Sequence, residues 1–325
     1  MLSSNRVLGL TLLVGCAAAS TFCGGAPTSP SATSQVSTQA AVNGTAGDTP
    51  TPGSPTAPTL PPPPGTGSAW VNAVGDIGWC GSEAMPKVAR LLDGLPGDIL
   101  LTGDIAYMNG SPEDFRRCFD PDFGRLANRL RPTPGNHDYG TSNGDGYFGY
   151  FGARAGLDRR GFYAFRAASW KVLMLNSSVP ITRNSEQYLW VQRQLQEEPT
   201  RCTLASFHHP FDSSGTNGPN PWLKDIWELL HQQGVELVLA AHDHLYERFA
   251  PMDADGRPDV ARGVRQFTTG TGGAPLYSRS RVAANSETLA QAYGVLRLRL
   301  DPTLYEWDFV DVNGASLDHG LTICH

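Results

Sequence analysis

Leu100–Leu101–Thr102–Gly103–Asp104–Ile105–Ala106–Tyr107 is the stretch from which the architecture of this 325-residue chain can be inferred. Its apolar start predicts a buried strand, and a glycine turn then presents an aspartate and, a little further on, a tyrosine. A carboxylate at this place is often a simple turn cap. Four other stretches nevertheless end in the same way, with an apolar run followed by Asp, Asn or His. Together the five stretches supply Asp76, Asp104, Tyr107, Asn136, His137, Asp138, His208, His242 and His244.

A strand–helix–strand unit explains why residues far apart in the chain should meet. Residues 69–74 are predicted to form a strand that ends at Asp76, and residues 83–92 have the apolar spacing of a helix. Residues 98–101 then form the strand that ends at Asp104. Such a unit places its strands in parallel, and ligands bind just outside the carboxyl ends of parallel strands. We therefore expect the two aspartates to lie close together.

The rest of the chain predicts an α/β fold. A hairpin is expected at residues 161–165 and 170–175, and further strands at 203–207 and 235–240. Helices are expected at residues 185–196, where Ser185 is the N-cap, and at 222–230. Alternating patterns predict a second, antiparallel sheet from residues 263–269, 293–300 and 304–310. The predicted architecture is a four-layer αββα sandwich, in which helices flank two mixed β-sheets.

The first 68 residues differ in composition from the rest. A weakly basic start and a short apolar run predict a signal peptide within residues 1–25, because the run is far too short to span a membrane. Leu13–Val14–Gly15–Cys16 resembles the lipobox of bacterial lipoproteins, although a simple cleavable signal stays open. Residues 26–68 have the Ser, Thr, Pro and Gly content of a disordered linker. Residues 69–325 are predicted to form the catalytic domain.

These features predict an exported protein, either a lipoprotein of the bacterial cell envelope (periplasmic or on the outer surface) or a secreted protein. Membrane contact is expected only through the N-terminal lipid anchor. The net charge is −6 and no run of Lys or Arg occurs, so no nucleic acid is expected as a dedicated partner. The oligomeric state is left open.

Six cysteines are typical of an exported chain. With Cys16 lipidated and Cys23 in the linker region, four cysteines remain, and these allow three pairings. We favour Cys80–Cys118 and Cys202–Cys324, since the first two cysteines both follow shortly after strands of the predicted site. Free buried thiols stay open for the second pair. The lack of a CxxC spacing argues against a metal site built from these cysteines.

Carboxylates and imidazoles that converge in this way suit a pair of metal ions. Two neighbouring cations repel each other, and a shared carboxylate from a rigid strand end makes the pair tolerable. Asp104 is the candidate for this bridge. Histidine nitrogens and carboxylate oxygens suit Fe, Zn and Mn. Two such ions can lower the pKa of a bound water and polarise a phosphoryl oxygen, so the pattern predicts a hydrolytic centre.

Five blocks also carry a family resemblance: Gly75–Asp76–x–Gly78, Gly103–Asp104–x–x–Tyr107, Gly135–Asn136–His137–Asp138, Ala205–x–x–His208 and Ala241–His242–x–His244. In this order they resemble the calcineurin-like metallophosphoesterases. They look most like the purple acid phosphatase branch, because most other branches have Asp-x-His in the first block and no tyrosine in the second. The fourth block starts with Ala205 where the family usually has Val, and the fifth starts with Ala241 where Gly is usual. The chain resembles the compact, single-domain bacterial form.

The resemblance implies a binuclear metal centre with two overlapping ligand sets. Asp76, Asp104, Tyr107 and His244 would hold Fe(3+), since tyrosinate suits this ion. Asp104, Asn136, His208 and His242 would hold Fe(2+), Zn(2+) or Mn(2+). The implied nucleophile is a metal-bound hydroxide.

Further roles follow from the same resemblance. His137 would donate a proton to the leaving group, and Asp138 would orient or charge its ring. Asn136, His137 and His209 are tentative substrate contacts, although His209 fits a turn cap equally well. Asp243, between two predicted ligands, is expected to face solvent. The aromatic cluster around Tyr147, Phe148, Tyr150 and Phe151 fits packing better than a substrate mouth.

The leading hypothesis is hydrolysis of phosphate monoesters outside the cytoplasm. An alternative keeps the metals but changes the substrates to phosphodiesters or nucleotides. A third hypothesis, from another class, is an envelope-anchored binding or structural protein whose metal site has lost its activity. The intact ligand set and His137 argue against this third hypothesis.

Overall fold

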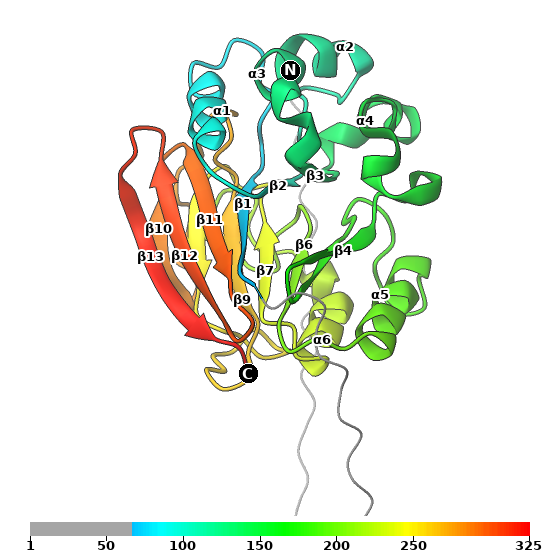
Figure 1. Cartoon of the computed structure of the whole chain (residues 1–325), viewed down its shortest axis with the longest axis vertical. Coiled ribbons are helices and arrows are strands. Elements are labelled where there is room, and N and C mark those ends of the chain that lie inside the picture. The colour runs from blue at the N-terminus through cyan, green and yellow to red at the C-terminus, as the bar shows by residue number, and fades with distance from the viewer. Residues whose placement is uncertain (1–66) are drawn as a thin grey trace, which may run out of the picture. The chain divides into compact units, whose positions relative to one another are not determined.

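The computed structural model describes residues 67–325. In this range two β-sheets pack face to face, and helices lie against their outer faces, as Figure 1 shows. The predicted four-layer α/β sandwich is therefore confirmed. The predicted signal peptide, Cys16 and the linker lie outside the described residues, and the domain boundaries stay a prediction. Among the described residues, no helix combines the length and the apolar character that crossing a bilayer requires.

The six-stranded sheet contains the predicted strand–helix–strand unit. Its order is β13-β12-β11-β1-β2-β3, and β1 and β3 both pair in parallel with β2. The helix α1 (Met85–Asp93) connects β1 and β2 and buries Val88 and Leu92 against the sheet. The strands are β1 (Ala69–Val74), β2 (Asp98–Thr102), β3 (Leu130–Thr133), β11 (Gly294–Leu300), β12 (Leu304–Asp311) and β13 (Ser316–Ile323).

The seven-stranded sheet has the order β10-β8-β9-β7-β6-β5-β4, with β5, β6, β7 and β9 in parallel. Its outer face is covered by α5 (Glu186–Glu197) and α6 (Lys224–Gln232). Ser185 caps α5 as predicted, because its side chain accepts the main-chain N–H of Tyr188 at 3.2 Å. The strands are β4 (Tyr163–Ala167), β5 (Trp170–Met174), β6 (Thr203–Ser206), β7 (Leu237–Ala240), β8 (Tyr246–Phe249), β9 (Arg265–Thr269) and β10 (Ser286–Ala290).

The predicted membership of the second sheet is wrong. The strand β9 lies between β7 and β8 in the seven-stranded sheet and runs parallel to β7. By contrast, β11 and β12 continue the sheet of β1. A pattern of apolar residues reports which faces of a strand are buried, not which strand lies beside it. The short or polar strands β8, β10 and β13 were not predicted as strands.

Short helical segments fill the region between β2 and β4. Tyr147, Phe148 and Phe151 of α4 are buried against Phe115 and Phe119, so the aromatic cluster is packing, as expected. The segments are α2 (Pro112–Asp114), the π-helical turn Phe115–Phe119, α3 (Asp120–Phe123), α4 (Asp145–Phe151) and 3₁₀ turns at Gly124–Arg129, His137–Tyr139, Ser142–Gly144, Gly152–Ala155 and Leu157–Arg159. A further 3₁₀ turn, Pro221–Leu223, lies between β6 and β7, directly before α6.

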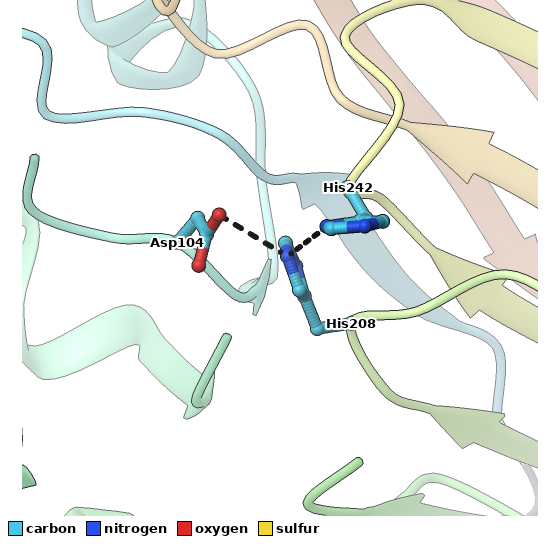
Figure 2. Close-up of side chains that lie close together, drawn as sticks. All are labelled: Asp104, His208 and His242. Atoms are coloured by element: carbon cyan, nitrogen blue, oxygen red, sulfur yellow. Dashed lines mark hydrogen bonds and ion pairs between the residues drawn. The ribbon is translucent and has the colours of Figure 1, made fainter. Parts of the chain in front are cut away.

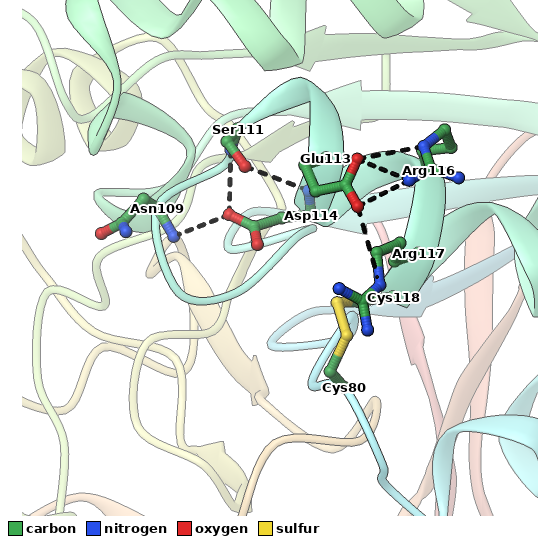
Figure 3. Close-up of a disulfide and its surroundings, with 8 residues drawn as sticks. All are labelled: Cys80, Asn109, Ser111, Glu113, Asp114, Arg116, Arg117 and Cys118. Carbon is green, nitrogen blue, oxygen red and sulfur yellow. Dashed lines mark hydrogen bonds and ion pairs between the residues drawn. A yellow bond between two sulfur atoms is a disulfide. The ribbon is translucent and has the colours of Figure 1, made fainter.

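Both favoured disulfides are present. Cys80–Cys118 ties the loop after β1 to the π-helical turn, beside the ion pairs of Glu113 with two arginines (Figure 3). Cys202–Cys324 joins the start of β6 to the segment after β13. The alternative of free thiols for the second pair is therefore wrong. This second bond connects the two sheets at the end of the molecule where the parallel strands begin.

Candidate metal centre

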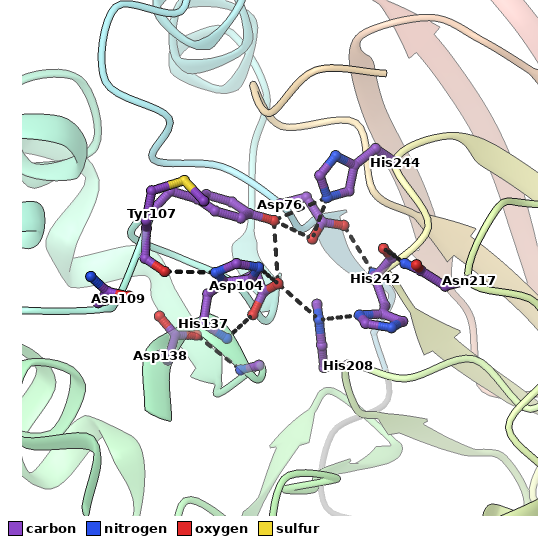
Figure 4. A network of polar contacts seen from close by, with 12 residues as sticks. Asp76, Asp104, Tyr107, Asn109, His137, Asp138, His208, Asn217, His242 and His244 are labelled. Atoms are coloured by element: carbon purple, nitrogen blue, oxygen red, sulfur yellow. Dashed lines mark hydrogen bonds and ion pairs between the residues drawn. The ribbon is translucent and has the colours of Figure 1, made fainter. Parts of the chain in front are cut away.

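The predicted site residues follow the carboxyl ends of strands in both sheets. Asp76 follows β1, Asp104 follows β2, and the segment of His137 follows β3. His208 follows β6, and His242 follows β7. Figure 4 shows these side chains turned toward one another from both sheets. The five loops therefore meet at one edge, as the parallel topology predicted.

The backbone at this edge adopts an unusual conformation. Asp76, Asp104 and His242 have φ angles of 56°, 50° and 69°, in the left-handed region that residues with a side chain seldom adopt. Such backbone strain gathers at functional sites. A side chain cannot be accommodated at Gly103, because an added Cβ would lie 2.5 Å from the Nδ1 atom of His208. The glycine before Asp104 thus lets a histidine from the other sheet approach.

Tyr107 lies at the centre of the buried part of the cluster. Its hydroxyl lies 2.8 Å from Asp76 Oδ1, 3.2 Å from Asp104 Oδ2 and 3.1 Å from His244 Nε2. All four side chains are almost completely buried. The other Asp76 oxygen accepts the main-chain N–H of His242 at 2.9 Å. Two carboxylates are thus held close together in the interior.

A second group of donors lies beside the first. His208 Nε2 is 3.2 Å from Asp104 Oδ2 and 3.2 Å from His242 Nδ1. Figure 2 shows His208 between the other two side chains. One ligand atom from each of Asp104, His208 and His242 lies within 4.8 Å of the others. Asp104 therefore contacts both groups, which is the geometry expected of a bridging ligand.

The outer nitrogens of two imidazoles are fixed by main-chain carbonyls. His208 Nδ1 donates to the carbonyl of Thr102 at 3.0 Å, and His244 Nδ1 donates to that of Pro275 at 2.8 Å. A carbonyl only accepts, so in each neutral ring the lone pair lies on Nε2, inside the cluster. With neutral rings, the cluster then holds two carboxylates and the Nε2 lone pairs of His208 and His244, and the Tyr107 hydroxyl is a donor among them. This excess of acceptors fits metal cations, and the N and O donors suit Fe, Zn and Mn.

The electrostatics of the protein without ions agree with this excess. Burial, and then the charges of Asp76 and Asp104, raise the pKa of Tyr107 well above its ordinary value. Burial disfavours charge at His208, but the attraction and hydrogen bond of Asp104 outweigh it and raise the His208 pKa to about 9. Burial also lowers the pKa of His242, to about 4. In the protein without ions, a proton on His208 therefore compensates part of the negative charge that a bound cation would otherwise compensate.

His137 lies at the rim of the cluster. Its main-chain N–H donates to Asp104 Oδ1 at 2.8 Å, which fixes the start of the loop. Its ring packs on Tyr107 with the centroids 4.5 Å apart, and Nδ1 donates to the carbonyl of Met108 at 2.6 Å. The side chain is 31% exposed, and Nε2 is 3.9 Å from Asp104 Oδ2. A proton on Nε2 can therefore be presented to a molecule bound over the cluster.

The family model of the calcineurin-like phosphoesterases matches residues 69–246, which is more than half of the chain. The chain belongs to this family. Purple acid phosphatase 18 of Arabidopsis thaliana is 28% identical over 243 residues, which cover 68% of this chain and 49% of that protein. Purple acid phosphatase 21 of the same plant is 29% identical over 226 residues, or 62% of this chain and 50% of that protein. The chain spans about half the length of the curated relatives it matches.

Solved structures agree on the fold. A purple acid phosphatase from seeds of yellow lupin (Lupinus luteus) has a TM-score of 0.66 and 18% identity, over 81% of this chain and 55% of that one. GAP50, described as the anchor in the inner membrane complex of Plasmodium, has a TM-score of 0.64 and 14% identity, over 79% of this chain and 89% of that one. At such identities the likeness concerns the fold alone. The sequence relatives place this family member in the purple acid phosphatase-like branch, as expected.

In this family member Asp138 does not orient the His137 ring, so the predicted contact is wrong. Asp138 is buried, and its carboxylate accepts the main-chain N–H groups of Ile105 and Gly135 at 3.0 and 2.9 Å. Burial, and then the charge of Asp104, raise the pKa of Asp138 to about 7. The carbonyl of Met108 takes the place expected for Asp138 at the ring. Asp138 instead holds the loops after β2 and β3 together.

Asn136 is the predicted ligand that the structure leaves outside the polar network. The residue is exposed, and the polar contacts that join the cluster within residues 67–325 do not involve its side chain. Its neighbour His137 is tied to Asp104 through the main chain, so Asn136 stays at the rim. Its role as a ligand of the second ion stays a prediction.

Asp243 is buried, so its expected position in solvent is wrong. Its carboxylate accepts the hydroxyl of Ser213 and the main-chain N–H of Asn217, the latter at 2.8 Å. The Asn217 side chain in turn donates to the main-chain carbonyl of His242 at 2.8 Å. Asp243 therefore anchors a loop that holds the last block in place. No signal in the sequence marks Ser213 or Asn217 for this task.

Two other features at the site were not predicted. The Tyr277 ring stacks on that of His244, with centroids 3.9 Å apart. Ala241 stands where the family usually has Gly, and its methyl group faces Gly75. A Cβ added to Gly75 would lie only 2.5 Å from this methyl group. The extra methyl is therefore accommodated because Gly75 has no side chain.

Proposed function

We propose that this chain is a metal-dependent phosphohydrolase that cleaves phosphate monoesters. The observation that carries the proposal is the buried cluster of two carboxylates, one phenol and three imidazoles, which has far more acceptors than donors. Membership of the calcineurin-like phosphoesterase family supports the same chemistry. The fold by itself does not decide function, so the proposal depends on the site.

We assign the residues to two cations as the resemblance implied. Asp76, Asp104, Tyr107 and His244 would hold Fe(3+), and Asp104, Asn136, His208 and His242 would hold Fe(2+), Zn(2+) or Mn(2+). The phenol at the centre of the first set supports a trivalent ion there, because a phenolate donates charge strongly. When bound, the two cations would polarise a phosphoryl oxygen and lower the pKa of water.

The remaining residues of the site position the substrate and move a proton. The Met108 carbonyl holds the Nδ1 proton of His137, so the proton given to the oxygen of the leaving alcohol is the one that Nε2 carries when the ring is charged. Asp138 holds the loop of His137 through main-chain N–H groups. Asn136 and His209 are the further candidates for substrate contacts.

A pair of aryl substrates tests the choice of monoesters. The purified protein, loaded with iron and zinc, is assayed with p-nitrophenyl phosphate and with bis(p-nitrophenyl) phosphate. We expect a higher kcat/KM for the monoester. A preference for the diester would replace the proposal by the phosphodiesterase alternative. A protein that takes up both metals and cleaves neither ester would favour a binding or structural role.

Metal analysis and a visible spectrum test the metal assignment. Protein purified without chelator should contain two metal ions per chain, one of them iron, and should show a charge-transfer band from Tyr107. Tyr107→Phe should remove the band, because the phenolate oxygen is its source. Two Mn or two Zn ions and no colour would contradict the assignment of iron while leaving the phosphohydrolase proposal intact.

We also propose that the protein is exported and anchored through Cys16. The proposal is supported by the lipobox-like segment and by two disulfides among the described residues, which are typical of oxidising compartments. Labelling with a radioactive fatty acid in a bacterial host should mark the chain, and Cys16→Ala should abolish the label. A label that persists in the variant would contradict the anchor.

A further inference from the structure

Ser177 and His209 form a hydrogen-bonded pair beside the cluster. Ser177 follows β5 and is only 4% exposed. Its Oγ accepts the main-chain N–H of His209 at 3.1 Å and lies 2.8 Å from Nδ1 of the same residue. The His209 ring is packed between those of His242 and Trp222, with centroid distances of 4.5 and 5.2 Å. The pair is thus in direct contact with a predicted ligand.

The hydrogen bonds of Ser177 determine which nitrogen of His209 carries the proton. A hydroxyl has one proton to donate, and the main-chain N–H of His209 needs an acceptor. Among the described residues, Nδ1 of His209 is the acceptor available to the Ser177 proton. If Nδ1 carried a proton itself, the buried hydroxyl would be left without an acceptor, which costs free energy. In the neutral ring, Nε2 is therefore the N–H.

His137 provides the contrast that makes this assignment informative. Its Nδ1 faces a carbonyl, which cannot donate, whereas Nδ1 of His209 faces a hydroxyl, which can. The two rim histidines are therefore held in opposite tautomers. Within the described residues, the one side-chain hydrogen bond of His209 is made by Nδ1, and the residue is only partly buried. Nε2 is left as a donor for a ligand.

We infer that Ser177 is a positioning residue, which fixes His209 as an Nε2–H donor to a phosphoryl oxygen of the substrate. The inference depends on the proposed function, since it concerns the same site. It divides the work between the two rim histidines, because His137 in its charged form transfers the proton on Nε2, whereas neutral His209 keeps its own. Ser177 acts only through His209 and does not touch the substrate.

Three single variants test the inference in the metal-loaded protein. Ser177→Ala removes the donor to Nδ1 and should lower kcat/KM about tenfold, as for other residues that orient a histidine from behind. Ser177→Thr keeps the hydroxyl and should stay close to the parent. Ser178→Ala is the matched control, because the buried Ser178 hydroxyl has no hydrogen-bond partner in the described part of the chain. Equal activities of the Ser177→Ala and Ser178→Ala variants would overturn the inference, as would a failure of Thr to restore activity.

A double-mutant cycle tests whether Ser177 acts through His209. If it does, Ser177→Ala should have no further effect on kcat/KM in a His209→Ala background. Independent losses that add up in the double variant would point to a general structural role and would overturn the inference. Thermal unfolding of all the variants shows whether the fold is retained.

Phosphate binding and the tautomer can be measured without turnover. Inorganic phosphate should bind the zinc-loaded Ser177→Ala variant about tenfold more weakly than the parent, as measured by calorimetry. Nitrogen-15 NMR of labelled histidine in the same samples should show Nε2–H for His209 in the parent and a mixture of tautomers in the variant. Equal phosphate affinity or an unchanged tautomer would overturn the inference. A parent that binds phosphate but cleaves no ester would contradict the proposed function alone.

Discussion

Buried charged groups lie at both ends of the parallel strands, but the two ends differ in how many hydrogen-bond partners the protein supplies for these groups. Where the strands begin, buried Glu236 accepts the main-chain N–H of His325 at 2.8 Å and lies 3.0 Å from its Nδ1. Buried Lys171 donates to two main-chain carbonyls at the end of α5. Where the strands end, Asp76, Asp104 and one imidazole, that of His244, share the single hydroxyl of Tyr107. One end is satisfied by its own partners, and the other leaves its acceptors to a ligand.

This difference separates stability from function. A buried charge that the protein itself pairs contributes to folding, and removing its partner costs free energy of unfolding. Two carboxylates held close together in the interior repel each other, and they are retained for what they bind. Changes at the site end should therefore affect metal binding and turnover more than stability, and changes at the other end should do the reverse.

The largest effect is expected from Asp104→Ala. Asp104 contacts both groups of donors, so its loss should empty both predicted metal positions. We expect kcat/KM to fall on the order of a thousandfold or more, because both cations act on the reaction. The metal-free variant should unfold at nearly the same urea concentration as the metal-free parent, because removing a buried carboxylate offsets the loss of its contacts with His208 and with the main-chain N–H of His137. Metal content by mass spectrometry, with kcat/KM and urea unfolding, checks all three.

Two results for Asp104→Ala would contradict this prediction. A variant that keeps two metal ions per chain would show that Asp104 does not bridge them. A metal-free variant much less stable than the metal-free parent would show that the carboxylate is structural, and the comparison of the two ends would fail.

The next largest effect is expected from His137→Ala. The side chain lies at the rim and makes no direct contact with Tyr107 beyond ring packing, so both metals should stay bound. Turnover of alkyl phosphates, whose leaving groups need a proton, should fall about a hundredfold or more. Activated aryl phosphates should be affected far less. His319→Ala, which changes an exposed histidine on β13, is the matched control. Equal losses on both kinds of ester would rule out the proton donor.

The sequence predicted those parts of the site that depend on side chains and strand ends. Asp76, Asp104 and Tyr107 follow glycine turns after apolar runs, and a parallel unit has only one edge where such residues can meet. His208 and His242 were found through the same pattern in the other sheet. Each of these signals lies within a few residues of the chain. Because the carboxyl ends of parallel strands lie at one edge of a sheet, the signals also predict which residues are close together in the folded protein.

Contacts made by the main chain could not be predicted. The carbonyls of Thr102, Met108 and Pro275 hold three histidines, and any residue type supplies a carbonyl. For this reason the sequence predicts Asp138 as the partner of the His137 ring, whereas Asp138 accepts main-chain N–H groups. The pairing of β9 was missed for a related cause, since burial on both faces does not identify the neighbouring strand.

Removing the Cys202–Cys324 disulfide should reduce stability and leave chemistry unchanged. The bond closes a separation of 122 residues at the end away from the site, whereas Cys80–Cys118 closes only 38. A double Cys→Ala variant at the longer bond should lose about 2–5 kcal/mol of unfolding free energy, with kcat/KM unchanged at 25 °C. Urea unfolding and steady-state kinetics check both values. A loss of turnover in a protein that is still folded would show that the two ends are coupled.

The smallest effect is a pH dependence at the same end. Glu236 raises the pKa of His325 above its ordinary value, through a hydrogen bond and its charge, although partial burial acts in the other direction. The charged pair therefore contributes fully to stability below about pH 6.5, and the contribution is lost as the pH rises through the higher folded pKa. Because His325 is partly exposed, the contribution should stay below about 1 kcal/mol. The difference in unfolding free energy between the parent and His325→Gln should therefore shrink as the pH rises from about 6.5 through the higher folded pKa. A difference that grows with pH would mean that His325 is neutral in the folded protein, and that buried Glu236 is stabilised by the main-chain N–H alone.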